Sequence, residues 1–357
     1  MYSIGTTIKV LYGRIAVGKN SFILALCLSG LCIISVTAQP AGTIQSLGGG
    51  ITSKTFYSST IDKDNTVWFL TESGILSFDG TKWTLHNKNN NIASSGLKGL
   101  TSDGTELLFA TNKGATVASL PVDAGSGVNT FHPDNSKLVS ENVLAVATGK
   151  KGLWWFGTDK GISASRSNTW LTNNYHNNYP EGIFSDYAIT SMATSQDGDS
   201  LYIGTIGGGV LRVFRNEVDA VSGASEYAAW GPILMPSDTV YSVHIAADGV
   251  QWIGTKKGVA KHTGYKTLEG WTVFTRAEGL ADDFVQAISS DSKGKIYFGT
   301  KNGLSVLEGT KWTTYKKENG LASNNILTIA VDKTDCVWVG TDDGVTSFKN
   351  GKLTSYR

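Results

Sequence analysis

The 357-residue sequence has little charge, little proline and few cysteines. Charged residues make up 17%, and 42 Gly stand against 6 Pro, which is typical of an ordered, turn-rich protein rather than a disordered or collagen-like one. The formal net charge is +1, and Lys and Arg form no basic run. Because phosphate binding depends on clustered cations, this composition argues against nucleic acid as a partner.

Motifs for catalysis and for metal binding are also missing. The five His residues show no H-E-x-x-H or other metal-ligand spacing, and no G-x-S-x-G elbow occurs. The Asp-x-x-Gly stretch from Asp291 to Gly294 is better explained as a turn between strands. We therefore expect a non-enzymatic protein without cofactor or metal. His176 with Asp186 is the one pair that a test of catalysis would address.

The first 38 residues have the pattern of a signal peptide. Three cations precede an apolar run from Phe22 to Val36, and Val36-Thr37-Ala38 offers the small residues of a cleavage site. This predicts a mature chain that begins at Gln39, exported to the periplasm, the cell surface or the medium, with no membrane span after cleavage. The alternative is an uncleaved anchor, although the run is short for a span of roughly 20 residues.

Cleavage would also remove two of the three cysteines, Cys27 and Cys32. Cys336 would then be the sole thiol, so an exported chain would have no internal disulfide and would depend on its core. The stretch GRIAVGKN from Gly13 to Asn20 resembles a phosphate-binding loop but has Asn in place of the hydroxyl residue. It is better explained as the charged start of the signal peptide.

What the sequence has in abundance is one short motif. The seven copies lie 40 to 50 residues apart and are WFLTESG at Trp68, LFATNKG at Leu108, WFGTDKG at Trp155, YIGTIGG at Tyr202, WIGTKKG at Trp252, YFGTKNG at Tyr297 and WVGTDDG at Trp338. Self-similarity at this period indicates a repeat architecture. The repeat domain spans residues 55–357, and residues 39–54 form a lead-in.

Each unit contains four short extended segments; in the last unit they are ILTIAVD, CVWVGT, GVTSFKN and KLTSY. Four strands in such a unit leave no room for a helix, and they match one blade of a β-propeller. The sequence therefore predicts an all-β fold, a seven-bladed β-propeller of four-stranded antiparallel blades. No closure strand is obvious, although residues 43–47 could contribute contacts where the ring closes.

The conserved types within the motif have a packing explanation. An aromatic residue two positions before a Gly gives a bulky side chain beside a flat spot, which suits blades stacked face to face. The T-x-x-G turn joins the second and third strands, and its Gly can adopt the positive φ that such a turn requires. The glycines concerned are Gly74, Gly114, Gly161, Gly208, Gly258, Gly303 and Gly344. Since the aromatics recur in every unit, we interpret them as packing residues and not as a sugar-binding array.

The pattern W-[IFV]-G-T-x-x-G, followed by an apolar strand and often by G-x-x-W, resembles the two-component regulator propeller repeat. The resemblance covers about residues 55–357, including the linkers at Glu278 to Val285 and Glu318 to Ile326, while the second unit departs from it with Leu108 and Ala110. It implies an extracytoplasmic sensor region of the kind found in hybrid histidine kinases, many linked to glycan use. Such sensors usually carry two propellers and a signalling tail, so the resemblance does not imply that this chain signals on its own, and signalling through a separate partner stays open.

In such a blade, the turns between the second and third strands share one face with the connections between blades, where loops often carry function. The candidate ligand-binding residues in these turns are Asp159, Lys160, Lys256, Lys301, Asn302 and Asp342. The alternative is that they are simply solvated turn residues.

The repeat is interrupted most visibly from Asn173 to Tyr187, where a connection is rich in amides and aromatics. Such side chains suit hydroxyl-rich ligands such as sugars; the alternative is a loop that packs over its own aromatics. The candidates here are Tyr175, His176, Tyr179, Phe184, Asp186 and Tyr187. A second expansion runs from Asn216 to Asp238.

Three functions stay open on the sequence. The first is an exported, non-catalytic ligand-binding or sensor-like module that takes a small molecule or glycan, with carbohydrate favoured by the resemblance alone. The second is a scaffold for another protein of the cell envelope. The third is a propeller lyase or hydrolase.

Overall fold

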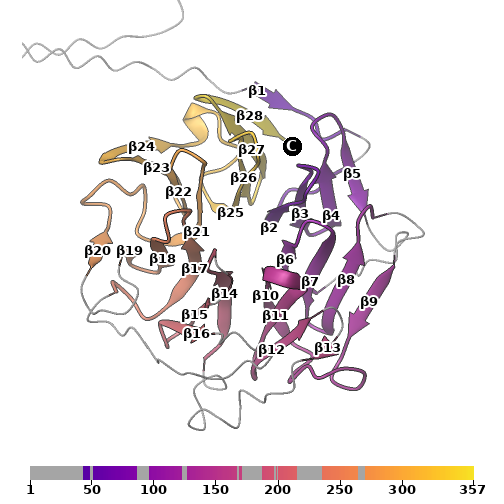
Figure 1. Cartoon of the computed structure of the whole chain (residues 1–357). Helices are drawn as coiled ribbons and strands as arrows, with labels where there is room; N and C mark the ends of the chain where they lie inside the picture. The colour runs from indigo at the N-terminus through magenta and orange to yellow at the C-terminus, as the bar shows by residue number, and fades with distance from the viewer. Residues whose placement is uncertain are drawn as a thin grey trace, which may run out of the picture. The chain divides into compact units, whose positions relative to one another are not determined.

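The computed structural model describes residues 43–48, 51–86, 96–122, 127–166, 169–170, 187–196, 198, 200–214, 235–263 and 270–357. All of them belong to the compact unit Ala41–Arg357. Apart from two 3₁₀ turns, Lys150–Gly152 and Lys317–Asn319, the regular structure in these ranges is β-strand. Seven antiparallel sheets follow one another around a common centre (Figure 1), which confirms the predicted seven-bladed propeller.

The first three blades each show four strands. Blade one consists of β2 (Phe56–Ile61), β3 (Val67–Thr71), β4 (Gly74–Phe78) and β5 (Trp83–His86). Blade two consists of β6 (Leu97–Ser102), β7 (Glu106–Thr111), β8 (Gly114–Ser119) and β9 (Val128–Phe131). Blade three consists of β10 (Val143–Gly149), β11 (Leu153–Thr158), β12 (Gly161–Arg166) and β13 (Thr169–Trp170).

Blade four shows three strands within the described ranges, β14 (Ile189–Thr194), β15 (Ser200–Thr205) and β16 (Val210–Phe214). Blade five consists of β17 (Val240–Ile245), β18 (Gln251–Thr255), β19 (Gly258–His262) and β20 (Trp271–Phe274). Blade six consists of β21 (Val285–Ser290), β22 (Ile296–Thr300), β23 (Gly303–Glu308) and β24 (Lys311–Tyr315). Blade seven consists of β25 (Ile326–Val331), β26 (Val337–Thr341), β27 (Gly344–Lys349) and β28 (Lys352–Tyr356).

None of the described residues forms a helix long and apolar enough to cross a membrane. The predicted signal peptide, residues 1–38, lies outside the described residues and stays a prediction.

The T-x-x-G turns have one recurring geometry. The Thr hydroxyl donates a hydrogen bond of 2.6–2.9 Å to the carbonyl of the Gly that closes the turn. Six of the seven predicted glycines have φ between 106 and 131°, which favours glycine over residues with a β-carbon. In blade four the prediction for Gly208 is wrong. There the turn is one residue longer, Thr205 donates to the carbonyl of Gly209, and Gly207 and Gly209 have the positive φ.

The aromatic and the Gly of the motif lie in the seam between blades. In β26, Trp338 is 4% exposed and packs with blade-one residues such as Phe69, while Val339 faces the core shared with blade six. A β-carbon on Gly340 would come within 2.9 Å of Cβ of Phe56, the first residue of blade one. The same contact recurs around the ring, because Gly157, Gly204, Gly254 and Gly299 each receive the first inner-strand residue of the following blade. The predicted packing of bulky side chains beside flat spots is therefore confirmed.

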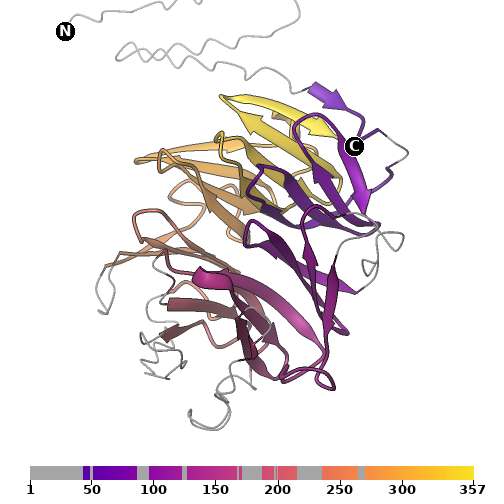
Figure 2. The same cartoon turned by 45° about the vertical axis from the view of Figure 1, so that its right-hand side comes forward.

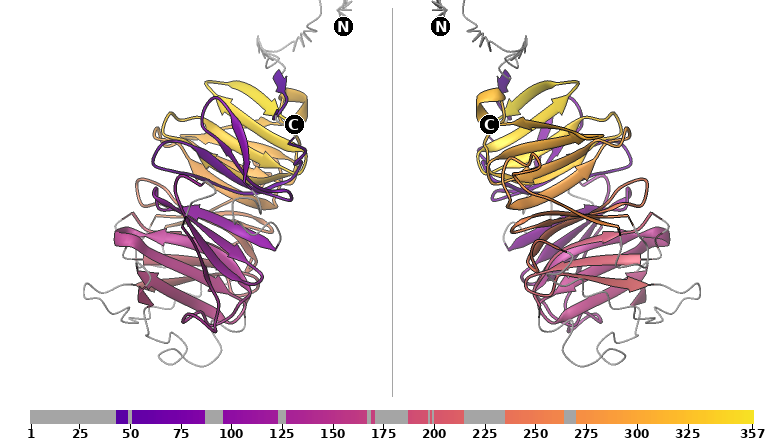
Figure 3. Two further views of the ribbon diagram at one scale, coloured as in Figure 1. Left: turned by 90° about the vertical axis from the view of Figure 1, so that its right-hand side faces the viewer. Right: turned by 90° about the vertical axis from the view of Figure 1, so that its left-hand side faces the viewer.

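The ring closes between blades one and seven without an exchanged strand. Inner strand β2 contacts β25 and β26, and the hydroxyls of Ser59 and Thr328 are 2.7 Å apart. In addition, β1 (Thr43–Gln45) pairs in parallel with β28 and gives blade seven a fifth strand (Figures 1, 2 and 3). Leu47, which follows β1, is 3% exposed in the apolar cluster of this seam. The expectation that residues 43–47 contact the closure is confirmed.

Candidate functional site

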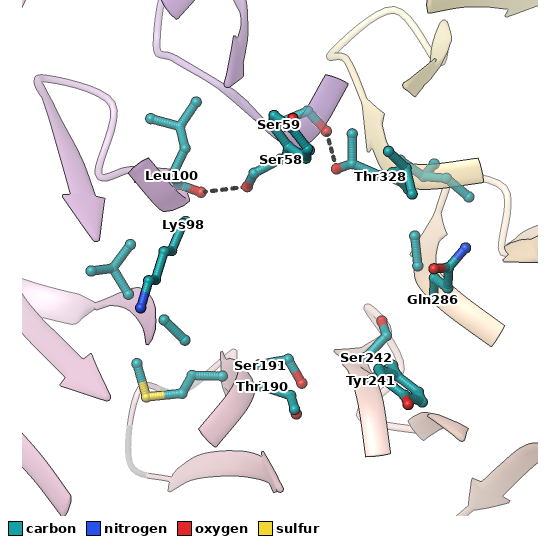
Figure 4. Close-up of a pocket in the computed structure, with 18 of the residues that line it drawn as sticks. Ser58, Ser59, Lys98, Leu100, Thr190, Ser191, Tyr241, Ser242, Gln286 and Thr328 are labelled. Carbon is teal, nitrogen blue, oxygen red and sulfur yellow. Dashed lines mark hydrogen bonds between the residues drawn. The ribbon is translucent and has the colours of Figure 1, made fainter. Parts of the chain in front are cut away.

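The inner strands of all seven blades surround one cavity of about 300 Å³ (Figure 4). Residues from β2, β6, β10, β14, β17, β21 and β25 line it. A cavity at the centre of a propeller draws one wall element from each repeat. Its chemistry is therefore set by the inner-strand residues that differ between blades and not by the shared motif.

Each inner strand carries a β-bulge at the same place. The register against the second strand shifts just after the first residue of every inner strand, from Phe56/Ser58 in blade one to Ile326/Thr328 in blade seven. One residue per blade is thereby left out of the pairing. The bulge residues are Tyr57, Lys98, Leu144, Thr190, Tyr241, Gln286 and Leu327, and all of them line the cavity. A bulge re-aims a side chain without interrupting the sheet, and here it does so seven times around one centre.

The residues on either side of each bulge residue explain how the ring accommodates one bulge in every inner strand. The residue before each bulge is apolar and packs into the seam between blades; Val240, Val285 and Ile326, for example, are 0% exposed. The residue after each bulge is small, with Ser, Gly, Ala or Thr in all seven blades. The apolar residue before each bulge thus provides the packing between blades, and the bulge residue itself can vary in chemical type.

Hydroxyl groups dominate the polar part of the cavity wall. Ser59 and Thr328 are hydrogen-bonded to each other, and Ser58 donates to the carbonyl of Leu100 at 3.5 Å (Figure 4). Thr190 donates to the carbonyl of Val240 at 2.7 Å. Of the described residues that line the cavity, Lys98 alone carries a formal charge. No carboxylate is among these described lining residues.

Lys98 is held by a side-chain chain that crosses into the next blade. Its ammonium donates a short hydrogen bond to Oδ1 of Asn142, in the connection before β10. The amide nitrogen of Asn142 donates to Oδ2 of Asp159 at 3.0 Å. Burial raises the pKa of Asp159, but hydrogen bonds from the Ser140 and Asn142 side chains outweigh it, so this pKa lies below its ordinary value. The ionised carboxylate therefore fixes the amide with its oxygen toward Lys98.

The same arrangement recurs between blades six and seven. Nε2 of Gln286, the bulge residue of β21, donates to Oδ1 of Asn325 at 3.0 Å and to the carbonyl of Ile326 at 2.9 Å. The amide nitrogen of Asn325 donates to Oδ2 of Asp342 at 2.9 Å. Because both bonds use the amide nitrogen of Gln286, its amide oxygen is left on the cavity side, across from Lys98 (Figure 4).

Between blades five and six the corresponding positions form an aromatic stack. The ring of Tyr241, the bulge residue of β17, lies 4.5 Å from the ring of Phe284 at an angle of 31°. The ammonium of Lys301 lies 3.8 Å from the centroid of Phe284, which is a cation–π contact. Lys301 is thereby held at the rim, and Tyr241 presents an aromatic wall to the cavity.

The structure thus places the predicted turn residues in different roles. Asp159, Asp342 and Lys301 belong to the three side-chain chains that reach the bulge residues. Lys160, Lys256 and Asn302 are exposed at turns, where their backbone N–H groups are hydrogen-bonded.

The long connection before blade four is described only at its end. Tyr187 packs on the turn of blade four, because a β-carbon on Gly208 would lie 2.6 Å from its ring. The other candidates of this connection, Tyr175, His176, Tyr179, Phe184 and Asp186, lie outside the described residues. The pair His176 with Asp186 therefore stays a prediction.

The Asp-x-x-Gly stretch at Asp291 has the structural role that the sequence suggested. Its carboxylate accepts a 2.9 Å bond from the hydroxyl of Tyr297 and bonds from two backbone N–H groups of its own turn. Burial, with this hydrogen bond, raises the pKa of Tyr297 well above its ordinary value. The carboxylates of Asp62 and Asp332 likewise accept hydrogen bonds from the indole N–H groups of Trp68 and Trp338. These carboxylates brace the blades.

Comparison with known proteins places the repeat. The family model described as two component regulator propeller matches residues 320–343, which confirms the resemblance seen in the sequence. No curated protein matches the chain.

Solved structures give the same fold. The extracellular domain of a protein described as a hybrid two component system from B. thetaiotaomicron is 20% identical with a TM-score of 0.69, over 86% of this chain and 41% of that chain. A streptogramin B lyase is 15% identical (TM-score 0.63, 84% and 95%), and the GH74 enzyme of Niastella koreensis is 15% identical (TM-score 0.61, 88% and 55%). The chain thus spans about two fifths of the extracellular domain that it resembles. It is a seven-bladed propeller, and its residues 320–343 match the two-component regulator propeller repeat.

Proposed function

We propose that this chain is an exported, non-catalytic ligand-binding module of the sensor type, and that its ligand binds at the central cavity and the surrounding turn face. Carbohydrate is the ligand class that we favour. One observation carries the site. Seven equivalent bulges place side chains of five residue types (Tyr, Lys, Leu, Thr and Gln) in the wall of one cavity, and the residue before each bulge is apolar in every blade.

The separation between apolar packing residues and variable cavity-lining residues supports ligand binding more than it supports catalysis. The described wall offers hydroxyls, one amide, one ammonium and aromatic rings, which are groups that bind hydroxyl-rich ligands through hydrogen bonds and ring contacts. The similar structures include, by name, the extracellular domain of a hybrid two component system, a streptogramin B lyase and a GH74 enzyme. Since one fold hosts different activities, the proposal depends on the site and not on the fold.

A glycan array with the purified full chain, followed by calorimetry on the best ligands, tests the proposal. We expect selective binding that Tyr241→Ala weakens, because Tyr241 forms an aromatic wall of the cavity. Val273→Ala is a control on an exposed outer-strand residue and should leave binding unchanged. The double variant Tyr175→Ala with Tyr179→Ala tests the predicted contribution of the long connection. The absence of binding across plant, host and microbial polysaccharides would contradict the proposal.

A scaffold for another envelope protein is the second candidate, and an exposed apolar side chain favours it. Ile206, in the turn of blade four, is 48% exposed on the same face. Burial of this side chain against a bound protein would remove apolar surface from water, which favours association. Ile206→Asp should then abolish the capture of a specific protein from the native envelope. If this variant leaves capture intact, the scaffold hypothesis for this face is wrong.

A further inference from the structure

The chemistry of the cavity wall says more about the ligand than its general class. Lys98 brings a positive charge to a cavity whose other described polar lining groups are neutral hydroxyls and one amide. A carboxylate on the wall would repel an anionic ligand, and the described lining contains none. The wall therefore has the polarity of a site for a ligand with one negative charge.

The ammonium of Lys98 is both positioned and available. Its side chain is exposed, and one of its three N–H donors is used by Asn142. The amide of Asn142 lies between the ammonium of Lys98 and the carboxylate of Asp159, which orients it. The adjacent Lys160 offsets part of the Asp159 charge. The two remaining donors of Lys98 can thus bind an anionic group at the cavity.

Opposite Lys98 the wall changes from donor to acceptor. Gln286 uses its amide nitrogen on Asn325 and Ile326, and its amide oxygen lies on the cavity side (Figure 4). This oxygen can accept a hydrogen bond from a ligand hydroxyl. Tyr241, in the neighbouring blade, also lines the cavity, and an aromatic side chain there suits contact with the apolar C–H surface of a sugar ring.

The size of the cavity limits how much of a ligand can enter. Its volume of about 300 Å³ lies at the lower end of the range of about 300–1,000 Å³ that is usual for small-molecule pockets. This volume suits the end of an oligosaccharide rather than a long stretch of one.

We propose that the cavity binds the terminal residue of an acidic carbohydrate, with the carboxylate of a hexuronic acid on Lys98 and a ring hydroxyl on Gln286. The proposal builds on the proposed carbohydrate function and adds the charge of the ligand and the residues that select it. Asn142 and Asp159 act as positioning residues for Lys98.

The test compares acidic and neutral forms of one ligand on the full chain by calorimetry. Oligogalacturonides are measured beside their methyl esters, which keep the sugar but lose the charge. We expect esterification to weaken binding roughly ten- to a hundredfold, the range for a hydrogen bond to a charged group, and high salt to weaken the acidic form. Lys98→Met should remove this preference for the acidic form. Lys256→Met is the matched control, since Lys256 is exposed on the same face but does not line the cavity.

Asn142→Ala gives an independent readout of the positioning role. We expect it to reduce the preference for the acidic form while Lys98 is still present. An unchanged acid-to-ester ratio in Lys98→Met would overturn the proposal, as would preferential binding of neutral or sulfated oligosaccharides by the unmodified chain. Neutral glycan binding with no role for Lys98 would leave the proposed function intact. Failure of every oligosaccharide to bind would overturn both. Melting temperatures of the variants check that each one folds.

Discussion

Gly340→Ala tests whether the seam between blades seven and one is as tightly packed as its contacts indicate. A β-carbon at Gly340 would lie 2.5 Å from Cγ2 of Thr328, 2.9 Å from Cβ of Phe56 and 3.1 Å from the carbonyl oxygen of Phe56. Phe56 is 0% exposed and its ring meets Phe69 edge-on at 5.4 Å. A backbone oxygen cannot turn away as a side chain can, so β2 itself would have to move.

The expected cost follows from two opposing effects. Overpacking a close-packed core costs about 1–3 kcal/mol. Replacing Gly by Ala in a compatible strand position recovers about 0.4–1 kcal/mol, because the unfolded chain loses freedom. We expect a net loss of about 1.3 kcal/mol. With an unfolding entropy of about 2.1 cal/mol/K per residue, such a loss lowers the Tm of a domain of this size by roughly 2 °C.

Two further variants calibrate the result. Gly99→Ala makes the same change inside a strand, but its nearest atom is 3.5 Å away, so we expect no loss. Gly299→Ala meets Cγ2 of Ile326 at 2.5 Å, and we expect an intermediate loss because that side chain can shift. Tryptophan fluorescence and circular dichroism during heating give the three Tm values. Equal stability of Gly340→Ala and Gly99→Ala would refute this account of the seam.

Three other substitutions address the turn, the closure and a partly buried histidine. Gly303→Val should cost about 1–3 kcal/mol of stability, since φ is 128° and a β-carbon would lie 2.7 Å from a backbone oxygen. The control Gly309→Ala should cost less, because a β-carbon there would meet nothing within 4 Å. Equal melting temperatures of the two variants would count against the turn geometry. Leu47→Ala should cost about 2–5 kcal/mol of stability, because this side chain is 3% exposed. The control Ile44→Ala, at a residue that is 68% exposed, should have no effect. Denaturant titration of both variants measures the two free energies of unfolding. Burial lowers the pKa of His244 to about 4, and an unfolded His titrates near 6.5, so the unfolded state binds more protons between these values. Stability should therefore fall as the pH drops from about 6.5 to about 4, by at most about 1.4 kcal/mol per pH unit, and His244→Gln should flatten this slope; an unchanged slope would rule His244 out as its source.

The fold could be predicted because its information is local and repeated. Each T-x-x-G turn pairs a short polar link with a residue that tolerates positive φ, and the aromatic and the Gly of β26 lie on one strand face by simple alternation. The prediction failed at Gly208, where three consecutive glycines in blade four hide which of them closes the turn. Loop length, rather than residue type, decided that case.

The cavity residues could not be predicted in the same way. The bulge residue varies between blades over five residue types, from the cation of Lys98 to the apolar Leu327. In the sequence it therefore stands between an apolar and a small residue without a recurring type of its own. Its place is set by backbone register, which a search for recurring residue types does not detect. The usable signal was a variable residue 13 to 15 positions before the T-x-x-G threonine, between an apolar and a small residue. The chain from Asn142 to Asp159 likewise depends on two segments that only the folded blade brings together.

The seven bulges separate the residues that determine ligand recognition from the residues that determine folding. Because a bulge residue such as Leu144 is outside the ladder pairing and lines an open cavity, its replacement changes what the cavity recognises at little cost to folding. The preceding residue, Val143, is 0% exposed in the core and has no such freedom. A family built on this blade could therefore acquire new ligands by drift at a handful of sites. A library randomised at those seven positions alone would remain foldable and would vary mainly in specificity.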